Sequence, residues 1–220
     1  MKLIARLAIT IPFSYMWLLR QSLGNPKTIL DLGCGNGSLM ELLGNEKKWK
    51  ITGVDLFLGN VKTASKKKLF TEVFKDDIVK FVKKQIKNKK KYDVVFCSQV
   101  IEHIDRKRGE ELLSLIESIA RQRIIVGTPR EFMEQSPSYL GVNPHQVHKS
   151  GWSEEDFRGR GYKVYGVGFS PFWSEEGLIR KKHNRAETAF YFVVSFLFSP
   201  VVYFIPKIAA GILCIKDIKR

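Results

Sequence analysis

The chain has 220 residues, of which 44% are hydrophobic, and 37 lysines and arginines against 22 acidic residues give it a net charge of +15. This composition, without any Pro-, Gly- or Ser-rich linker, predicts a single domain over residues 1–220 rather than linker-joined modules. The three cysteines are scattered without metal-ligand spacing, which excludes a cysteine-based metal centre and indicates a reducing, cytoplasmic compartment.

Residues 1–24 are expected to form an N-terminal helical cap over a binding cleft. They contain an uncharged run from Leu7 to Leu19 behind a basic start, which superficially resembles a secretion signal. The run is too short to span a bilayer and no small-residue cleavage site follows it, so we interpret it as part of the folded chain. A helix that merely packs on the sheet is the alternative.

The segment from Thr28 to Gly37 predicts a strand, a tight turn and a helix. Ile29 to Leu32 is short and apolar, three glycines follow at alternate positions, and helical periodicity resumes at Ser38. Glycine allows backbone angles that a Cβ forbids and lets a ligand approach the bare main chain. In the dinucleotide fingerprint the third glycine falls where Ser38 stands here. The spacing therefore favours a nucleoside ligand in a Rossmann-like unit.

Acidic residues follow the next two predicted strands. Asp55 ends the strand that begins near Trp49, and a carboxylate there can accept hydrogen bonds from both hydroxyls of a ribose. Asp76 and Asp77 lie at the tip of the strand after it. A fourth strand, Tyr92–Ser98, runs into the sequence Gln-Val-Ile-Glu-His.

These motifs resemble, in order, those of class I S-adenosylmethionine-dependent methyltransferases, of the small-molecule type similar to the ubiquinone-biosynthesis enzymes. The first is Asp31-Leu-Gly-Cys-Gly-Asn-Gly37, and the fourth-strand signature departs from the family at Gln99, where glutamate is common. The resemblance covers roughly residues 25–170. It implies S-adenosyl-L-methionine as cofactor, and as cofactor-binding residues Asp31, Gly33, Cys34, Gly35, Gly37, Asp55, Leu56, Phe57, Asp76, Asp77, Ile78, Ser98, Gln99 and Val100.

The resemblance also implies roles. The first two glycines of the turn border the methionine end of the cofactor, and Asp31 supports its amino group. Asp55 binds the ribose, and one of the two residues after it covers the adenine ring. The adenine-side acid is Asp77, which precedes an isoleucine, or else Asp76. The transferred methyl lies near Gln99 or its neighbour Val100.

A lysine cluster lies between the third and fourth predicted strands. It extends from Lys80 to Lys91 on a helix whose apolar side is expected to be Ile78, Val82 and Ile86, which places the lysines on the solvent face. This charge fits an anionic partner, either nucleic acid or a membrane surface, and a simply solvated face is the alternative. Phe81 is the single aromatic residue among these lysines, so aromatic residues do not alternate with them. The Asn/Asp-Pro-Pro-aromatic motif of base-modifying methylases is also absent after the fourth strand, which argues against a nucleic-acid substrate.

The irregular segment from Arg130 to Trp152 is expected to form the acceptor side of the cleft, because open α/β sheets build their sites beyond the carboxyl ends of their strands. We rank His148 ahead of His145 as a catalytic residue, since an imidazole can accept a proton from a substrate hydroxyl or amine. A structural role, pairing loop carbonyls, is the alternative. No metal site is expected, because two histidines without a nearby acid or cysteine provide too few ligands.

The C-terminal part should complete the sheet with strands over Tyr162–Gly168 and Gly211–Lys216. Between them, residues 186–210 form a hydrophobic insertion, in which Thr188 to Pro206 carries no charge and Pro200 divides the run. The proline favours an interfacial or buried hairpin over a spanning helix. The expected fold is α/β and Rossmann-like, a mostly parallel seven-stranded sheet with helices on both faces and an antiparallel last strand.

We therefore expect a methyltransferase that acts on a small, apolar or lipid-like acceptor, in the cytoplasm or peripherally at the inner membrane face. Oxygen, nitrogen and carbon all stay open as the accepting atom. One alternative is an RNA-associated methyltransferase or RNA-binding protein that uses the lysine-rich face. The other is a membrane-attached protein that binds the cofactor but is catalytically silent.

Overall fold

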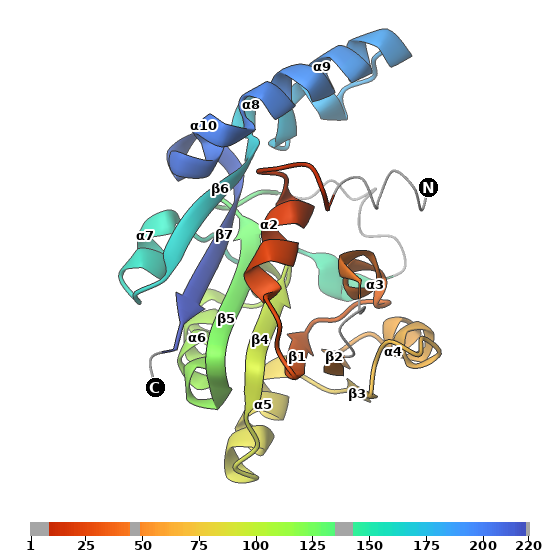
Figure 1. Ribbon diagram of the computed structural model, residues 1–220, viewed down its shortest axis with the longest axis vertical. Helices are drawn as coiled ribbons and strands as arrows, with labels where there is room; N and C mark the ends of the chain where they lie inside the picture. The colour runs from red at the N-terminus through yellow and green to blue at the C-terminus, as the bar shows by residue number, and fades with distance from the viewer. Residues whose placement is uncertain (1–8, 45–48, 135–142, 219–220) are drawn as a thin grey trace.

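The computed structural model describes residues 9–44, 49–134 and 143–218, which are built around one seven-stranded sheet (Figure 1). The strand order is β3-β2-β1-β4-β5-β7-β6. β1 to β5 pair in parallel, whereas β7 lies between β5 and β6 and runs antiparallel to both. The predicted sheet with its antiparallel last strand is confirmed. The strands are β1 (Thr28–Leu32), β2 (Lys50–Asp55), β3 (Glu72–Lys75), β4 (Tyr92–Ser98), β5 (Ala120–Pro129), β6 (Lys163–Phe169) and β7 (Ala209–Asp217).

Helices cover both faces of this sheet. Successive strand residues point to opposite faces, so that Ile29 joins an apolar core with α2 and α3, while its neighbour Leu30 joins a second core with α5 and α6. The helices are α2 (Tyr15–Leu23), α3 (Ser38–Leu43), α4 (Leu58–Ser65), α5 (Ile78–Lys87), α6 (Arg106–Ile119), α7 (Glu154–Arg158), α8 (Ser170–Trp173), α9 (Arg185–Leu197) and α10 (Ser199–Phe204).

The lysine-bearing helix α5 departs from the prediction at one position. Ile78 and Val82 are buried as expected, but Ile86 is exposed and Gln85 is buried in its place, where its side chain accepts a hydrogen bond from the hydroxyl of Tyr92. A residue seven positions after Ile78 returns closer to the same helical face than one eight positions after it. The buried polar group is tolerated because it has a hydrogen-bond partner.

The described part of the N-terminal segment packs on the sheet and also reaches a cavity. α2 starts at Tyr15, where the side chain of Ser14 accepts a hydrogen bond from the backbone N–H of Trp17, and its Leu18 and Leu19 are buried against the sheet. Residues 11–16 border the cavity described below. Residues 1–8 of the predicted cap lie outside the described residues.

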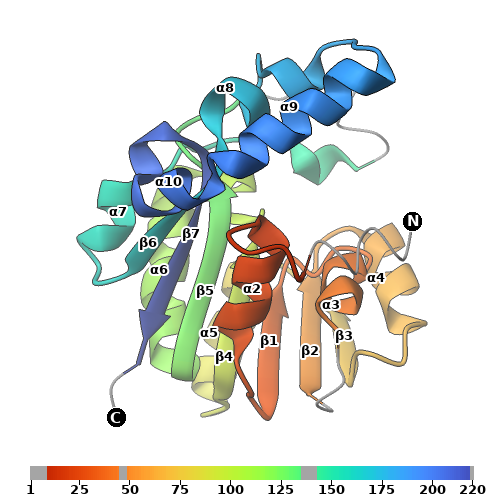
Figure 2. The same ribbon diagram turned by 45° about the horizontal axis from the view of Figure 1, so that its top comes forward.

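The hydrophobic insertion forms α9 and α10, which Figure 2 shows beyond the end of the sheet at which the parallel strands finish. The chain turns between the two helices at Phe198, and Pro200 lies in the first turn of α10, where its missing N–H is no loss. Only Ser195 of α9 and Val202 of α10 are buried, so the hairpin is largely exposed rather than buried. Within the described ranges, no helix has the length and apolar character needed to cross a membrane.

Candidate functional site

The glycine turn after β1 presents bare main chain at the carboxyl end of the sheet. All three glycines have left-handed backbone angles, with φ of +70° at Gly33, +55° at Gly35 and +79° at Gly37. A Cβ on Gly33 would lie 2.3 Å from a methyl carbon of Val100, whereas one on Gly35 would meet no atom within 4 Å. The backbone at Gly35 therefore faces open space that a ligand can enter.

Asp55 joins this turn to the end of β2. Its carboxylate accepts hydrogen bonds from the backbone N–H groups of Gly35 (2.9 Å) and Phe57 (2.8 Å) and from the side chain of Asn60 (3.3 Å). Next to it, Leu56 is 41% exposed at the same edge. An acid that can still accept from a ligand thus lies beside an apolar surface suited to a flat ring.

Asp31 is a second, more deeply buried carboxylate behind the turn. Burial, and then the neighbouring charge of Asp55, raise its pKa from 3.8 to about 8. Neither carboxylate is ion-paired with any residue that the structure describes. A cationic ligand group placed here would favour the ionised form of Asp31, so the pair suits a ligand with a positive charge.

The two acids after β3 are used differently. Partial burial opposes ionisation of Asp77, but hydrogen bonds from Arg108 (2.7 and 2.8 Å) and from the backbone at the start of α5 outweigh it and lower its pKa. Asp76 accepts the backbone N–H of Asp77 and is partly exposed. The carboxylate of Asp77 is therefore engaged in capping α5 and holding α6, and Asp76 is the acid with capacity for a further partner. Ile78 is buried in the core.

The tip of β4 has an unusual backbone. Gln99 has a φ of +57°, which is strained for a residue with a Cβ, and its N–H donates to the carbonyl of Gly127 (2.7 Å). Ser98 precedes it, with its hydroxyl 2.5 Å from that of Tyr15 in α2. Burial raises the pKa of Tyr15 to about 12. The residues on either side of Gln99 thus contact different parts of the fold. Ser98 contacts Tyr15 of the N-terminal segment, and Val100 packs on the glycine turn.

A cavity of about 780 Å³ opens beside Gln99. Its polar groups are few, and one of them, the hydroxyl of Ser195, accepts a hydrogen bond from the indole N–H of Trp173 (2.6 Å). The volume and character suit a small, mainly apolar molecule. The lining residues are Ile11, Phe13, Ser14, Tyr15, Met16, Gln99, Val167, Gly168, Trp173, Phe192, Val193, Ser195, Phe196 and Ser199.

The two predicted histidines differ in their surroundings. His145 is exposed on a short 3₁₀ helix, Pro144–Gln146. His148 is half-buried, and its ring centroid lies 4.9 Å from that of His103, which follows the buried acid Glu102 after β4. Burial lowers the pKa of His103 to about 4 and raises that of Glu102 to about 8. The expectation that no acid lies near these histidines is therefore wrong, because the folded chain brings Glu102 beside His148.

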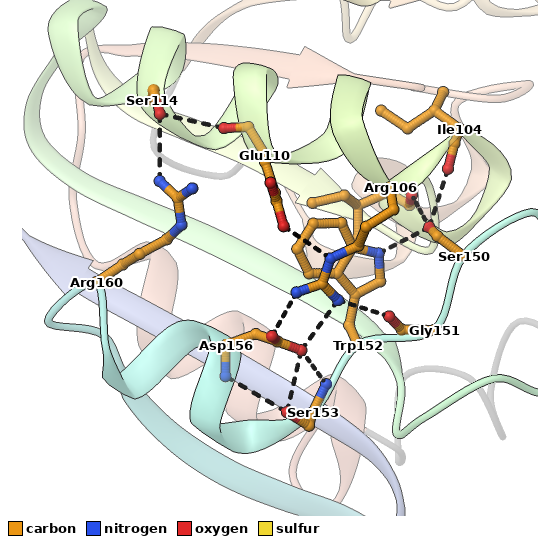
Figure 3. Close-up of polar contacts among 11 residues, drawn as sticks. Ile104, Arg106, Glu110, Ser114, Ser150, Gly151, Trp152, Ser153, Asp156 and Arg160 are labelled. Atoms are coloured by element: carbon orange, nitrogen blue, oxygen red, sulfur yellow. Dashed lines mark hydrogen bonds and ion pairs between the residues drawn. The ribbon is translucent and has the colours of Figure 1, made fainter.

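An arginine anchors the end of this loop (Figure 3). The guanidinium of Arg106, at the start of α6, lies over the ring of Trp152 (4.0 Å), donates to the carbonyl of Gly151 (2.8 Å) and pairs with Asp156. The indole N–H of Trp152 donates to the hydroxyl of Ser150 (2.9 Å). The segment that follows His148 is therefore fixed on the fold.

A family model described as "Methyltransferase domain" matches residues 13–126, which is more than half of the chain. The chain belongs to the class I S-adenosylmethionine-dependent methyltransferases. The predicted family and the cofactor S-adenosyl-L-methionine are thus confirmed. The bare backbone at Gly35 and the carboxylates of Asp31 and Asp55, which have no ion-pair partner among the described residues, fit this cofactor, which carries ribose hydroxyls and positive charge.

Curated relatives of this methyltransferase are ubiquinone biosynthesis O-methyltransferases. Those of Rickettsia bellii and Rickettsia typhi are 32% and 30% identical over 98 and 100 residues, which is 44% of this chain in both cases. The match spans 40% and 39% of the relatives' own length. The match therefore covers less than half of this chain and less than half of each relative.

Solved structures share the fold over nearly the whole length of this chain. A SAM-dependent methyltransferase from Archaeoglobus fulgidus aligns with a TM-score of 0.60 at 20% identity, over 99% of this chain and 94% of its own. The magnesium protoporphyrin IX methyltransferase of Synechocystis PCC 6803 with bound SAH aligns with a TM-score of 0.53 at 14% identity, over 99% and 83%.

Sequence reasoning did not identify Tyr15 and Trp173 at the cavity, or Glu102 and His103 beside His148. The adjacent Glu102 and His103 after β4 were part of a recognised motif. A carboxylate next to an imidazole was the signal that could have marked them as functional residues. Nothing in the local sequence marks Tyr15 or Trp173, because each reaches the cavity from a distant element.

Proposed function

We propose that this methyltransferase transfers the methyl group of S-adenosylmethionine to a small, predominantly apolar acceptor. The observation that carries the proposal is the apolar cavity, which is bordered by Gln99 at the tip of β4; the next residue, Val100, packs on Gly33 of the glycine turn. The bound donor supplies an electrophilic methyl on a sulfonium. Most of the acceleration then comes from aligning the two molecules in a closed, dry cleft.

On the donor side, we assign the main chain of Gly33 and Gly35 to the methionine end and Asp31 to the amino group. Asp55 accepts from the ribose hydroxyls, while its bonds to the backbone keep its orientation. For the adenine amine we favour Asp76 over Asp77, since the latter already accepts from Arg108 and from the start of α5.

On the acceptor side, Gln99, the hydroxyl of Tyr15 and the apolar walls orient the molecule and exclude water. We assign activation of the accepting atom to His148. Its Nδ1 is 2.5 Å from the carbonyl oxygen of Met133, which can only accept, so Nδ1 carries the proton and Nε2 holds the lone pair. His145, which is exposed, ranks behind it.

We further propose that the enzyme attaches peripherally to an anionic membrane through α9 and α10. Phe190, Leu197 and Phe204 are 63%, 68% and 73% exposed, although each would bury a large apolar area in a lipid surface. Basic residues flank the hairpin, with Lys181 and Lys182 before α9 and Lys207 after α10. Near an anionic leaflet each adds about 1 kcal/mol of attraction.

The function is tested by incubating the protein with donor carrying a labelled methyl group and with fractionated extract of its own cell. Label in an apolar small-molecule or lipid fraction supports the proposal. Label in RNA supports the RNA-associated alternative, and donor binding without transfer to any fraction supports a catalytically silent protein.

The membrane part is tested by flotation with anionic liposomes. Changing Phe190, Leu197 and Phe204 to serine should abolish flotation, whereas Phe196→Ser, at the cavity wall, should reduce turnover more than flotation. An intact protein that stays in the soluble fraction at low salt would exclude the attachment.

The lysine-rich face of α5 supports the RNA alternative less well. The helix extends away from α9 and the carboxyl ends of the strands (Figure 1), so a polymer bound along it would not lie over the cavity. Lys83 is also paired with Glu111, which reduces the charge available to a phosphate backbone.

A further inference from the structure

We propose that Glu102, His103 and His148 bind a divalent first-row transition-metal ion. Glu102 and His103 lie on the 3₁₀ helix Ile101–His103 just after β4, and His148 comes from the loop that returns beneath α6. One ligand atom from each of the three residues lies within 4.8 Å of the others. A carboxylate and two imidazoles are a frequent donor set for such ions.

The imidazoles are oriented as metal ligands are. Nδ1 of His103 is 3.3 Å from the carbonyl oxygen of Val147, and Nδ1 of His148 is 2.5 Å from that of Met133. A carbonyl only accepts, so both Nδ1 atoms carry the proton and both Nε2 atoms keep their lone pairs. Donation from the other ring nitrogen to a carbonyl is the usual support of a metal-bound histidine.

Glu102 supplies an independent observation. The residue is 2% exposed, and one carboxylate oxygen accepts from the hydroxyl of Thr128 (3.1 Å). The other oxygen, Oε1, is fully buried and has no hydrogen-bond partner among the residues that the structure describes. A buried carboxylate oxygen without a partner is costly, and a cation bound between it and the two histidines removes that cost.

The backbone around the three residues is fixed before any ion binds. The N–H groups of Lys149 and Ser150 both donate to the carbonyl of Glu102 (2.7 and 3.1 Å), and the hydroxyl of Ser150 bonds to the carbonyls of Ile101 and Ile104. The contacts of Arg106 and Trp152 in Figure 3 hold the same segment from the other side. His148 is therefore tied directly to the helix that carries the other two ligands.

The donor set selects the metal class. Two nitrogens and one oxygen favour Zn²⁺, Mn²⁺, Fe²⁺ or Co²⁺ over Mg²⁺ and Ca²⁺, which prefer oxygen ligands. A Zn²⁺ ion would draw the ligand atoms to about 2.0–2.2 Å from itself, a small adjustment of side-chain angles. Three protein ligands leave positions open for the acceptor. If the proposed function holds, an acceptor hydroxyl bound to the ion loses its proton more easily, and His148 then contributes as a ligand of the ion instead of acting on the acceptor with a free Nε2.

The test uses untagged full-length protein, stripped with a chelator and titrated with Zn²⁺ by calorimetry and with Co²⁺ by visible absorption, without donor or acceptor. We expect one ion per chain. His148→Ala and Glu102→Gln should each weaken binding by at least about 10- to 100-fold. His145→Ala is the matched control, because it removes an exposed histidine of the same loop, and it should leave the affinity unchanged.

Retained binding of S-adenosylmethionine shows that each variant is folded. No stoichiometric binding to the wild type, or equal affinity in His148→Ala, overturns the metal site. A bound ion whose removal leaves methyl transfer to an identified acceptor unchanged would keep the site and overturn its catalytic role. Because the titration needs no turnover, it can succeed or fail independently of the proposed function.

Discussion

The proposed donor and acceptor sides of the cleft are built in different ways. The donor side is polar and local, because the glycine turn after β1 and the acids after β2 and β3 come from consecutive strand ends of one parallel sheet. The acceptor side is apolar and assembled from residues 11–16, the tip of β4, the end of β6, α8 and α9. Under the proposed function, the cofactor is thus bound by the regular part of the fold, and the acceptor by loops and helices around the sheet.

The largest expected effect belongs to the acceptor side alone. His148→Ala should lower turnover by about 10²- to 10⁴-fold, because it removes the imidazole assigned to activating the accepting atom. The affinity for S-adenosylmethionine should stay nearly unchanged in calorimetry, and His145→Ala should behave like the wild type. Full turnover across the pH range would show that His148 is only structural.

A comparison of two glycine-to-alanine variants separates an effect on donor binding from an effect on stability. Gly35 and Gly44 both have positive φ, and a Cβ on either would meet no atom within 4 Å. Changing either to alanine should destabilise the fold similarly, by roughly 1–2 kcal/mol for the left-handed backbone. Only Gly35→Ala should also weaken donor binding, by about 10-fold or more, because its Cβ enters the space assigned to the cofactor. Equal donor affinities in the two variants would contradict that placement.

Asp55→Ala tests the proposed ribose contact. Loss of a charge-assisted pair should cost about 1–3 kcal/mol, which is about 5- to 150-fold in donor affinity measured by calorimetry. Asp217→Ala, which removes an exposed partner of Arg123, is the control. An unchanged donor affinity in Asp55→Ala would contradict the assignment of Asp55 to the ribose.

The last prediction concerns Asp31 in the protein without donor. Its folded pKa of about 8 lies above the unfolded value near 3.8, so the folded state holds a proton that the unfolded state releases. The contribution of Asp31 to the free energy of unfolding should therefore be greatest below about pH 4 and should fall as the pH rises to about 8. Asp31→Asn should remove this component of the decline, seen as a smaller drop in Tm between pH 5 and pH 8.5. A decline as steep as that of the wild type would show that Asp31 is not the source.

The residues proposed for the donor side could be chosen from the sequence because their signals are local. The spacing of Gly33 and Gly35 and the acid at Asp55 each report a strand end, and parallel strands bring their ends to one edge. No comparable rule of topology predicts which residues meet on the proposed acceptor side. Tyr15 and Ser98 are 83 positions apart and meet only through the packing of α2 on the sheet.

Two sequence predictions met limits of the same kind. Ile86 was expected in the core on a spacing of four, but the burial of Gln85 follows from its contact with Tyr92 on another element. A metal site was not expected because no acid lies near the two histidines in the sequence, but Glu102, which follows β4, lies beside His148 in the folded chain. Both depend on tertiary contacts that periodicity and local composition do not contain.

The hydroxyl of Tyr15 lies where a side chain at position 127 would begin, since a Cβ on Gly127 would be 2.1 Å from that oxygen. The two positions therefore cannot change independently. Among homologous sequences, we expect residue 127 to acquire a side chain only in lineages where residue 15 has become smaller, a correlated substitution that links the first helix to the fifth strand. Restoring glycine in such a lineage would leave a void beside the tip of β4, so the exchange would be hard to reverse once the smaller residue was established.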